Sequence, residues 1–143
     1  MNLRKKIIDI LIISFLISMV IIVSFFNLIS EEQGSENFAG TVLLLILFVC
    51  AEVVSLILCK KAISAFCLGY FSIAFLSLLY GFLMDIFDIG YNALAFVCSL
   101  LIAPFYGFIY VSETSSQYIS LFAILILGAI AAIICFFGKK ERL

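Results

Sequence analysis

The residue with the strongest claim to chemistry is Glu52, which interrupts the apolar run VLLLILFVCAEVVSLILCKK at residues 42–61. On a helix it lies roughly 12 Å before Lys60. An ionised acid at that depth in a bilayer costs about 3 kcal/mol or more, so it must be protonated, paired or in contact with water. We expect an ion or proton site, a contact to a basic residue of a partner's helix, or a neutral acid hydrogen-bonded between helices. The sequence leaves these alternatives open.

Other residue types give little support to catalysis. Asp85 and Asp88 form a close acid pair, but intramembrane aspartyl proteases take their two acids from different helices, with one in a GxGD motif, and this chain has neither feature. There is no histidine, which removes most zinc sites and nucleophile–histidine dyads. The five cysteines lie in apolar segments without a CxxC pair, as small hydrophobic residues do. We expect no enzyme activity, metal or cofactor.

The composition explains where such residues must sit. Hydrophobic residues make up 66% of the 143 residues and charged residues only 12%, whereas charged residues form roughly a quarter of soluble domains. Lipid must therefore solvate most of the surface. The basic residues form three small groups and no stripe, so nucleic-acid binding is not expected.

Long apolar runs between short polar loops predict an all-α polytopic integral membrane protein with one transmembrane domain over residues 1–143. The five expected spans cover residues 7–29, 38–59, 62–84, 92–111 and 118–137. The first run is longer than the apolar core of a cleaved signal peptide, so we expect it to remain as a helix. No linker is long enough to divide the chain into domains.

The basic residues predict the orientation, because Lys and Arg stay in the cytoplasm. The expected anchors are Arg4, Lys5, Lys6, Lys60 and Lys61. This places the N-terminus inside, but five spans would then put the basic tail GKKERL outside. Four spans plus a re-entrant segment at residues 92–111 would remove the conflict. Pro104 could turn such a segment, although its length would also allow it to span.

Small residues at helical spacing predict packing faces, because lipid supplies no hydrophobic drive between helices. Three of the expected helices carry such stripes. Their members are Ala74, Ser77 and Gly81; Ala95, Ser99, Ala103 and Gly107; and Gly128 and Ala132. These faces pack either the protein's own helices or a partner.

The run YGFLMDIFDIGYNALAF at residues 80–96 resembles the central pattern of MreD, a small polytopic subunit of the bacterial rod-shape machinery. That pattern has a GxxxD at a helix end, a turn, and a Gly-x-x-Ala-Leu that opens the next helix. The matching positions are Gly81, Asp85, Gly90, Ala93 and Leu94. The turn is shorter than the family's, and its Arg-Pro-Asp upstream is missing. The resemblance implies a cell-shape subunit as one alternative.

The absence of a catalytic constellation, together with small loops and small-residue stripes, favours a non-enzymatic accessory protein. It would act by helix–helix association with partner membrane proteins, as an assembly or immunity-type subunit, or with copies of itself. The alternative is a small ion- or solute-transporting protein with Glu52 as its intramembrane protonatable site. Either protein would reside in a plasma membrane, by composition a bacterial inner membrane.

Overall fold

The computed structural model describes residues 3–29, 34–58, 60–110 and 117–138. Within these ranges the chain is helical and has no strand. The elements are α1 (Leu3–Ile29), α2 (Ser35–Ile57), α3 (Lys61–Ile86), α4 (Ala93–Ile102), the 3₁₀ helix η1 (Ala103–Tyr110) and α5 (Gln117–Phe137). The all-α fold class is confirmed.

Four of these helices, α1, α2, α3 and α5, are long and apolar enough to cross a membrane. Their bounds lie within a few residues of the expected spans, because an uninterrupted apolar run of about 20 residues matches a hydrocarbon core of roughly 30 Å. Large aliphatic and aromatic side chains cover their outer faces, with Ile22, Val49 and Leu127 about 60% exposed or more. A surface of this kind suits lipid.

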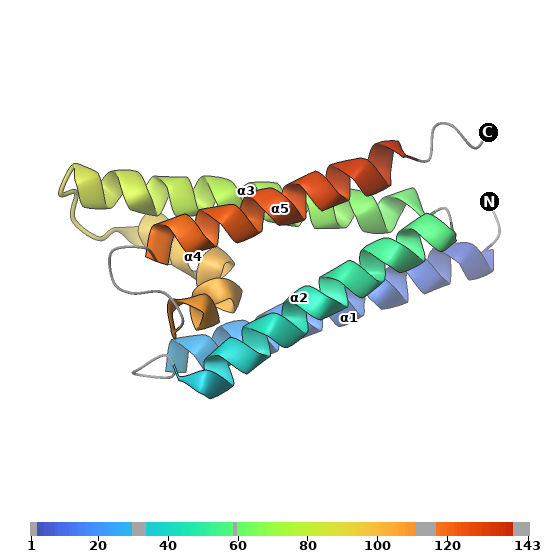
Figure 1. The fold of residues 1–143 in the computed structure, drawn as a ribbon, viewed down its shortest axis with the longest axis horizontal. Helices are drawn as coiled ribbons and strands as arrows, with labels where there is room; N and C mark the ends of the chain where they lie inside the picture. Colours follow the sequence, from blue (N-terminus) through green and yellow to red (C-terminus); the bar gives the residue numbers. More distant parts are fainter. Residues whose placement is uncertain (1–2, 30–33, 59, 111–116, 139–143) are drawn as a thin grey trace.

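The long helices form two antiparallel pairs (Figure 1). α1 lies beside α2, and α3 packs most extensively against α5. α4 and η1 lie between the pairs at one end of the molecule, where they contact α1, α2 and α3. The start of α1, the link between α2 and α3, and the end of α5 gather at the opposite end.

The expected fourth span differs from the other four. It forms only ten residues of α-helix, about 15 Å at 1.5 Å per residue and half of a hydrocarbon core. The Asn92 side chain caps its start by accepting a hydrogen bond from the Ala95 amide at 2.9 Å. At Ala103–Pro104 the helix changes to η1, and the chain returns toward the end from which it entered (Figure 1). The count of five spans is therefore not confirmed; the described residues fit four spans plus a re-entrant segment.

A buried polar cluster from α1 and α2 holds this turn. Asn27 donates to the carbonyl oxygens of Ala103 at 2.8 Å and Pro104 at 3.2 Å. Thr41 donates to the same Pro104 carbonyl at 2.8 Å. The Asn37 amide donates to the Asn27 side-chain oxygen at 3.1 Å. Irregular backbone at membrane depth is tolerated only where protein or water satisfies it. Asn27 and Thr41 supply the donors here, and Asn37 holds the Asn27 side chain in place.

Aromatic packing surrounds the same region. The Phe48 ring stacks on Tyr70 at 5.4 Å between centroids and meets Phe71 at 5.1 Å. Phe105 of η1, fully buried, lies 6.1 Å from both Tyr70 and Phe71. Offset and tilted aromatic pairs of this kind add attraction beyond the area they bury. The re-entrant segment is thus a packed part of the core, joined to α2 and α3.

Candidate functional site

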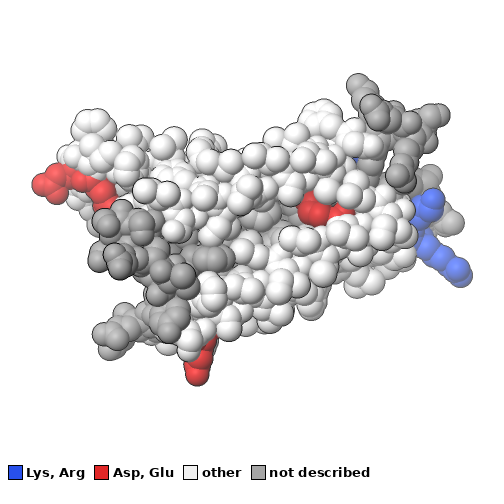
Figure 2. All heavy atoms as spheres, in the orientation of Figure 1, with Lys and Arg blue, Asp and Glu red and all other residues white. Residues whose placement is uncertain are grey.

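Glu52 lies in a groove of about 380 Å³ between α2, α3 and α5. Besides Glu52 the groove is lined by apolar side chains and one thiol: Leu45, Phe48, Val49, Val53, Phe71, Ile124, Leu127, Gly128, Ala131 and Cys135. Figure 2 shows acidic atoms in a hollow between these elements, on a face that is otherwise uncharged along its middle. A carboxyl group in an apolar groove between helices long and apolar enough to cross a membrane is the least expected polar feature of the described residues.

The Glu52 carboxyl has no N–H or O–H hydrogen-bond donor among the described residues. Its side chain is 6% exposed, and neither oxygen meets such a donor at bonding geometry. Ser55, one turn further along the same face, instead donates to the Lys60 carbonyl at 2.7 Å and pairs with Ser64. The buried Cys67 thiol of α3, a weak donor, lies close enough for an electrostatic and side-chain hydrogen-bond interaction with the carboxyl. The described residues thus offer the acid one weak thiol donor and no N–H or O–H donor.

This arrangement sets what Glu52 can do. A carboxylate offers about four acceptor positions, and one protonated oxygen adds a donor. An unsatisfied buried group of this kind costs roughly 1–3 kcal/mol, which a suitable donor would recover. No cluster of three metal-ligating side chains occurs in the described part of the chain. Glu52 is therefore equipped to receive a hydrogen-bond donor or a cation entering from the groove.

The small-residue stripe of the fourth segment does not stay on one face. Ala103 and Gly107 are buried, and Gly107 packs against α2, where an added Cβ would lie 2.2 Å from the Asn37 carbonyl oxygen. Ala95 and Ser99 instead line a cavity beside α3. The stripe divides because the α-helix ends at Ile102 and the 3₁₀ turn rotates the later residues toward α1 and α2.

The other two stripes pack α3 and α5. Ala74 and Ala132 are completely buried. A Cβ on Gly128 would lie 2.5 Å from the Phe71 ring, so the glycine permits close approach of the two helices. A Cβ added to Gly81 would have no neighbouring atom within 4 Å. Gly81 and Ser77 line the same cavity as Ala95.

The predicted topology anchors fall into two groups. Arg4, Lys5, Lys6 and Lys61 are exposed at the end of the molecule that holds the start of α1. Lys60 is only 7% exposed, and its ammonium lies 2.8 Å from the Asp9 carboxylate of α1. It also donates to the Lys5 carbonyl. Lys60 therefore links α1 to the start of α3. The sequence could have indicated this pair, because Asp9 and Lys60 carry opposite charges at the same end of two expected spans.

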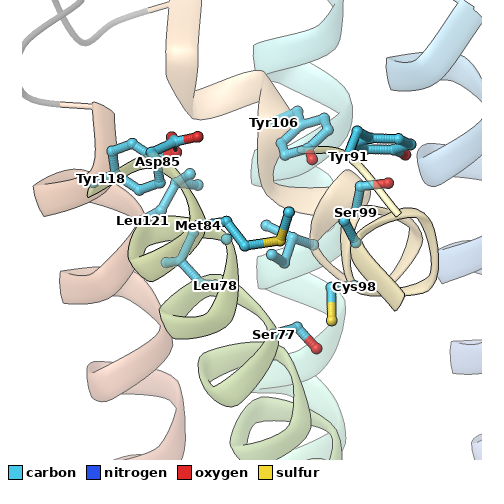
Figure 3. A pocket seen from close by; sticks show the side chains of 13 residues that line it. Ser77, Leu78, Met84, Asp85, Tyr91, Cys98, Ser99, Tyr106, Tyr118 and Leu121 are labelled. Atoms are coloured by element: carbon cyan, nitrogen blue, oxygen red, sulfur yellow. Dashed lines mark hydrogen bonds between the residues drawn. The ribbon is translucent and has the colours of Figure 1, made fainter. Parts of the chain in front are cut away.

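A second cavity, of about 320 Å³, was not expected from the sequence. It lies between α3, α4, η1 and α5, and Figure 3 shows Asp85, Tyr91, Tyr106 and Tyr118 gathered on one side of it. Tyr118 donates a hydrogen bond to Asp85. These residues come from four separate parts of the chain: α3 and α5 bring Asp85 and Tyr118 together, and the turn into η1 adds Tyr106.

Searches of protein-family models, curated proteins and solved structures found no match to this chain. They therefore give no support to the resemblance of residues 80–96 to MreD.

Proposed function

We propose that the protein is a non-enzymatic membrane subunit that associates with a transmembrane helix of a partner membrane protein through the Glu52 groove. The observation that carries this proposal is the Glu52 carboxyl, buried in an apolar groove with no N–H or O–H donor among the described residues and only the weak Cys67 thiol donor beside it. The partner helix would place a Lys, Arg or amide donor at the depth of Glu52. Pairing with such a donor would offset the cost of burying the acid.

The shape of the groove supports a helix as its occupant. Val49 and Val53 of α2 form one wall, and Leu127 of α5 forms the other; all three are between 46% and 66% exposed. Gly128 and Ala131 are small residues in its lining, which allow close approach of a helix backbone. A second copy of this chain lacks a donor of the required kind, since the described spans carry no Lys or Arg at the depth of Glu52. A different protein is therefore the proposed occupant.

The proposed orientation places the ends of the described chain in the cytoplasm of a bacterial inner membrane. On the face that Figure 2 shows, Lys and Arg lie at one end and the acids, apart from the acidic hollow, at the other. Asp9 also lies at the basic end, where it pairs with Lys60. The positive-inside rule assigns the basic end to the cytoplasm. With four spans and a re-entrant segment, α5 ends on the same side as α1 begins, so the basic residues 139–142 no longer oppose the rule. A reporter fused after Leu143 should be active in the cytoplasm; periplasmic activity would contradict this orientation.

Site-specific photo-crosslinking in the native membrane tests the proposed association. A photoreactive amino acid at Val49 or Leu127, on the two walls of the groove, should form an adduct with one membrane protein. The same amino acid at Ile22, which is 59% exposed on α1 but outside the groove, is the matched control. Fragmentation of the adduct should locate the crosslink in a transmembrane segment that has a basic or amide side chain within one helical turn.

Two results would count against the proposal. Equal adduct yields from Val49 and Ile22 would show that the groove has no preference. An adduct of twice the protein's mass would identify a second copy of the chain as the occupant. The transport hypothesis gains nothing from the groove, because Glu52 and Cys135 are the only polar groups in its lining and do not form a path through the bilayer.

A further inference from the structure

The cavity between α3, α4, η1 and α5 has a polar side and an apolar side. Figure 3 shows the Asp85 and Tyr118 side chains together on one flank and Tyr106 and Tyr91 together on the other. Leu78, Met84 and Leu121 lie between and below them, and Ser77 and Cys98 lie farther from the tyrosines. The volume of about 320 Å³ is at the lower end of the roughly 300–1,000 Å³ that small-ligand pockets occupy.

The polar side is built from specific contacts. Tyr118 donates to a carboxylate oxygen of Asp85, which fixes the acid beside an aromatic ring. The Tyr106 hydroxyl is close enough to Tyr91 and to Tyr118 for electrostatic interaction with both. The three tyrosines and the acid therefore converge on one region, although they come from α3, the α3–α4 turn, η1 and α5. Among the residues that the structure describes, no Lys or Arg lines the cavity.

Tyrosine rings and a carboxylate around one cavity are the groups that recognise ammonium ions. The electron-rich ring faces attract a cation, and the acid supplies a full negative charge. An anionic or phosphate-only ligand would meet repulsion from Asp85 and would find no basic partner in the lining. The apolar side chains below the tyrosines would accept hydrocarbon attached to the cation.

We propose that this cavity binds the ammonium group of an amphipathic molecule, held between Asp85 and the tyrosines, with its apolar part against Leu78, Met84 and Leu121. Two sources share this chemistry: the headgroup of an ammonium-bearing bilayer lipid and a free single-chain amphipathic amine. The site is separate from the Glu52 groove, so it stands whether or not the proposed partner helix exists.

Protection of a native cysteine tests the proposal on the full chain. Cys98 lines the cavity and is partly exposed, whereas Cys50 is exposed on α2 outside it. In nanodiscs of phosphatidylglycerol, tetradecyltrimethylammonium should slow N-ethylmaleimide modification of Cys98 at least threefold and leave Cys50 unchanged. Tetradecyl maltoside and tetradecyl sulfate, with the same chain but neutral and anionic heads, should protect Cys98 much less. Equal protection by all three amphiphiles, or no protection, would overturn the proposal.

Asp85 in the last turn of α3 and Asp88 just after this helix provide matched variants. Asp85→Asn should raise the half-protecting concentration of tetradecyltrimethylammonium about fivefold, the effect of losing one solvent-exposed ion pair. Asp88 has φ of 52° and does not line the cavity, and asparagine tolerates this backbone conformation, so Asp88→Asn is the control and should change nothing. Equal shifts of the half-protecting concentration in both variants would mean that only the general surface charge matters, and would overturn the proposal. If Asp85→Asn fails to fold, the three-amphiphile comparison decides on the unaltered protein.

A change of bilayer distinguishes the two sources. Nanodiscs that contain phosphatidylcholine alongside phosphatidylglycerol should protect Cys98 without any added amphiphile if a bilayer lipid is the ligand. Protection only by the added single-chain amine would assign the site to a free amphiphile. Failure of both would overturn the proposal, and would leave the helix-docking function of Glu52 unaffected.

Discussion

Replacing Glu52 with methionine should stabilise the isolated protein while weakening its association with a partner. The carboxyl is 6% exposed, and neither oxygen has an N–H or O–H donor in the described chain. An unsatisfied buried polar group costs about 1–3 kcal/mol, and hydrophobic replacement of buried charge often stabilises by a similar amount. Methionine is flexible enough to fill the position among apolar neighbours. Glu52→Met should therefore raise the free energy of unfolding by about 1–3 kcal/mol.

The assay is an unfolding titration with sodium dodecyl sulfate in mixed micelles, followed by near-ultraviolet circular dichroism. The chain has six tyrosines and no tryptophan, so tyrosine and phenylalanine packing supplies the signal. Glu52→Gln keeps an unsatisfied polar group and should change stability by less than about 1 kcal/mol. Val53→Met, on the exposed wall of the groove, should be neutral. A loss of stability in Glu52→Met would contradict the claim that the buried carboxyl destabilises the isolated protein, because it would mean that the acid already has a stabilising partner within the chain.

Three further predictions use the same assay. Asn27→Leu removes the donor to the turn carbonyls and should destabilise by about 2 kcal/mol, whereas an unchanged midpoint would mean that the polar cluster does not hold the re-entrant segment. Gly107→Ala should destabilise the protein by about 1–3 kcal/mol through overpacking. The added methyl group of Gly81→Ala would lie in open space, so this variant should be neutral or slightly stabilising. Similar effects of both substitutions would contradict the packing described. Lys60→Met leaves its acidic partner on α1 unpaired and should destabilise by about 3 kcal/mol or more, whereas the exposed Lys61→Met should have little effect.

The long helices were predictable because their cause is local. An apolar run of sufficient length must satisfy its backbone internally, and a helix is the simplest solution. Four expected spans therefore match helices of the structure closely at both ends. The composition of the fourth segment did not decide whether it forms a full-length helix or turns back. Its turn depends on donors from Asn27 and Thr41, which lie more than sixty residues away in sequence from the Ala103 and Pro104 carbonyls. No local pattern indicates such a contact.

One of the two candidate sites was predictable from the sequence and the other was not. Glu52 was found from sequence because an acid within an apolar helix is unusual in itself. Its lack of an N–H or O–H donor among the described residues could not be found, since Ser55 and other polar side chains at suitable spacing turn out to bond elsewhere. The amphiphile cavity could not be predicted at all. It requires Asp85 and Tyr118, which meet where α3 packs on α5, to lie beside Tyr91 and Tyr106, and the turn at Pro104 is what brings Tyr106 to them.

The most direct test of the proposed function is the yield of the photo-crosslink from Val49, compared between the unaltered protein and Glu52→Met in the same native membrane. With Glu52 present, we expect a clear adduct to one partner helix. With methionine at this position, the adduct yield should fall at least tenfold. The two proteins should be expressed equally, and the isolated Glu52→Met protein should be no less stable. A helix bound only by apolar packing would tolerate the substitution. An adduct of undiminished yield in Glu52→Met would contradict the claim that this acid is the docking contact.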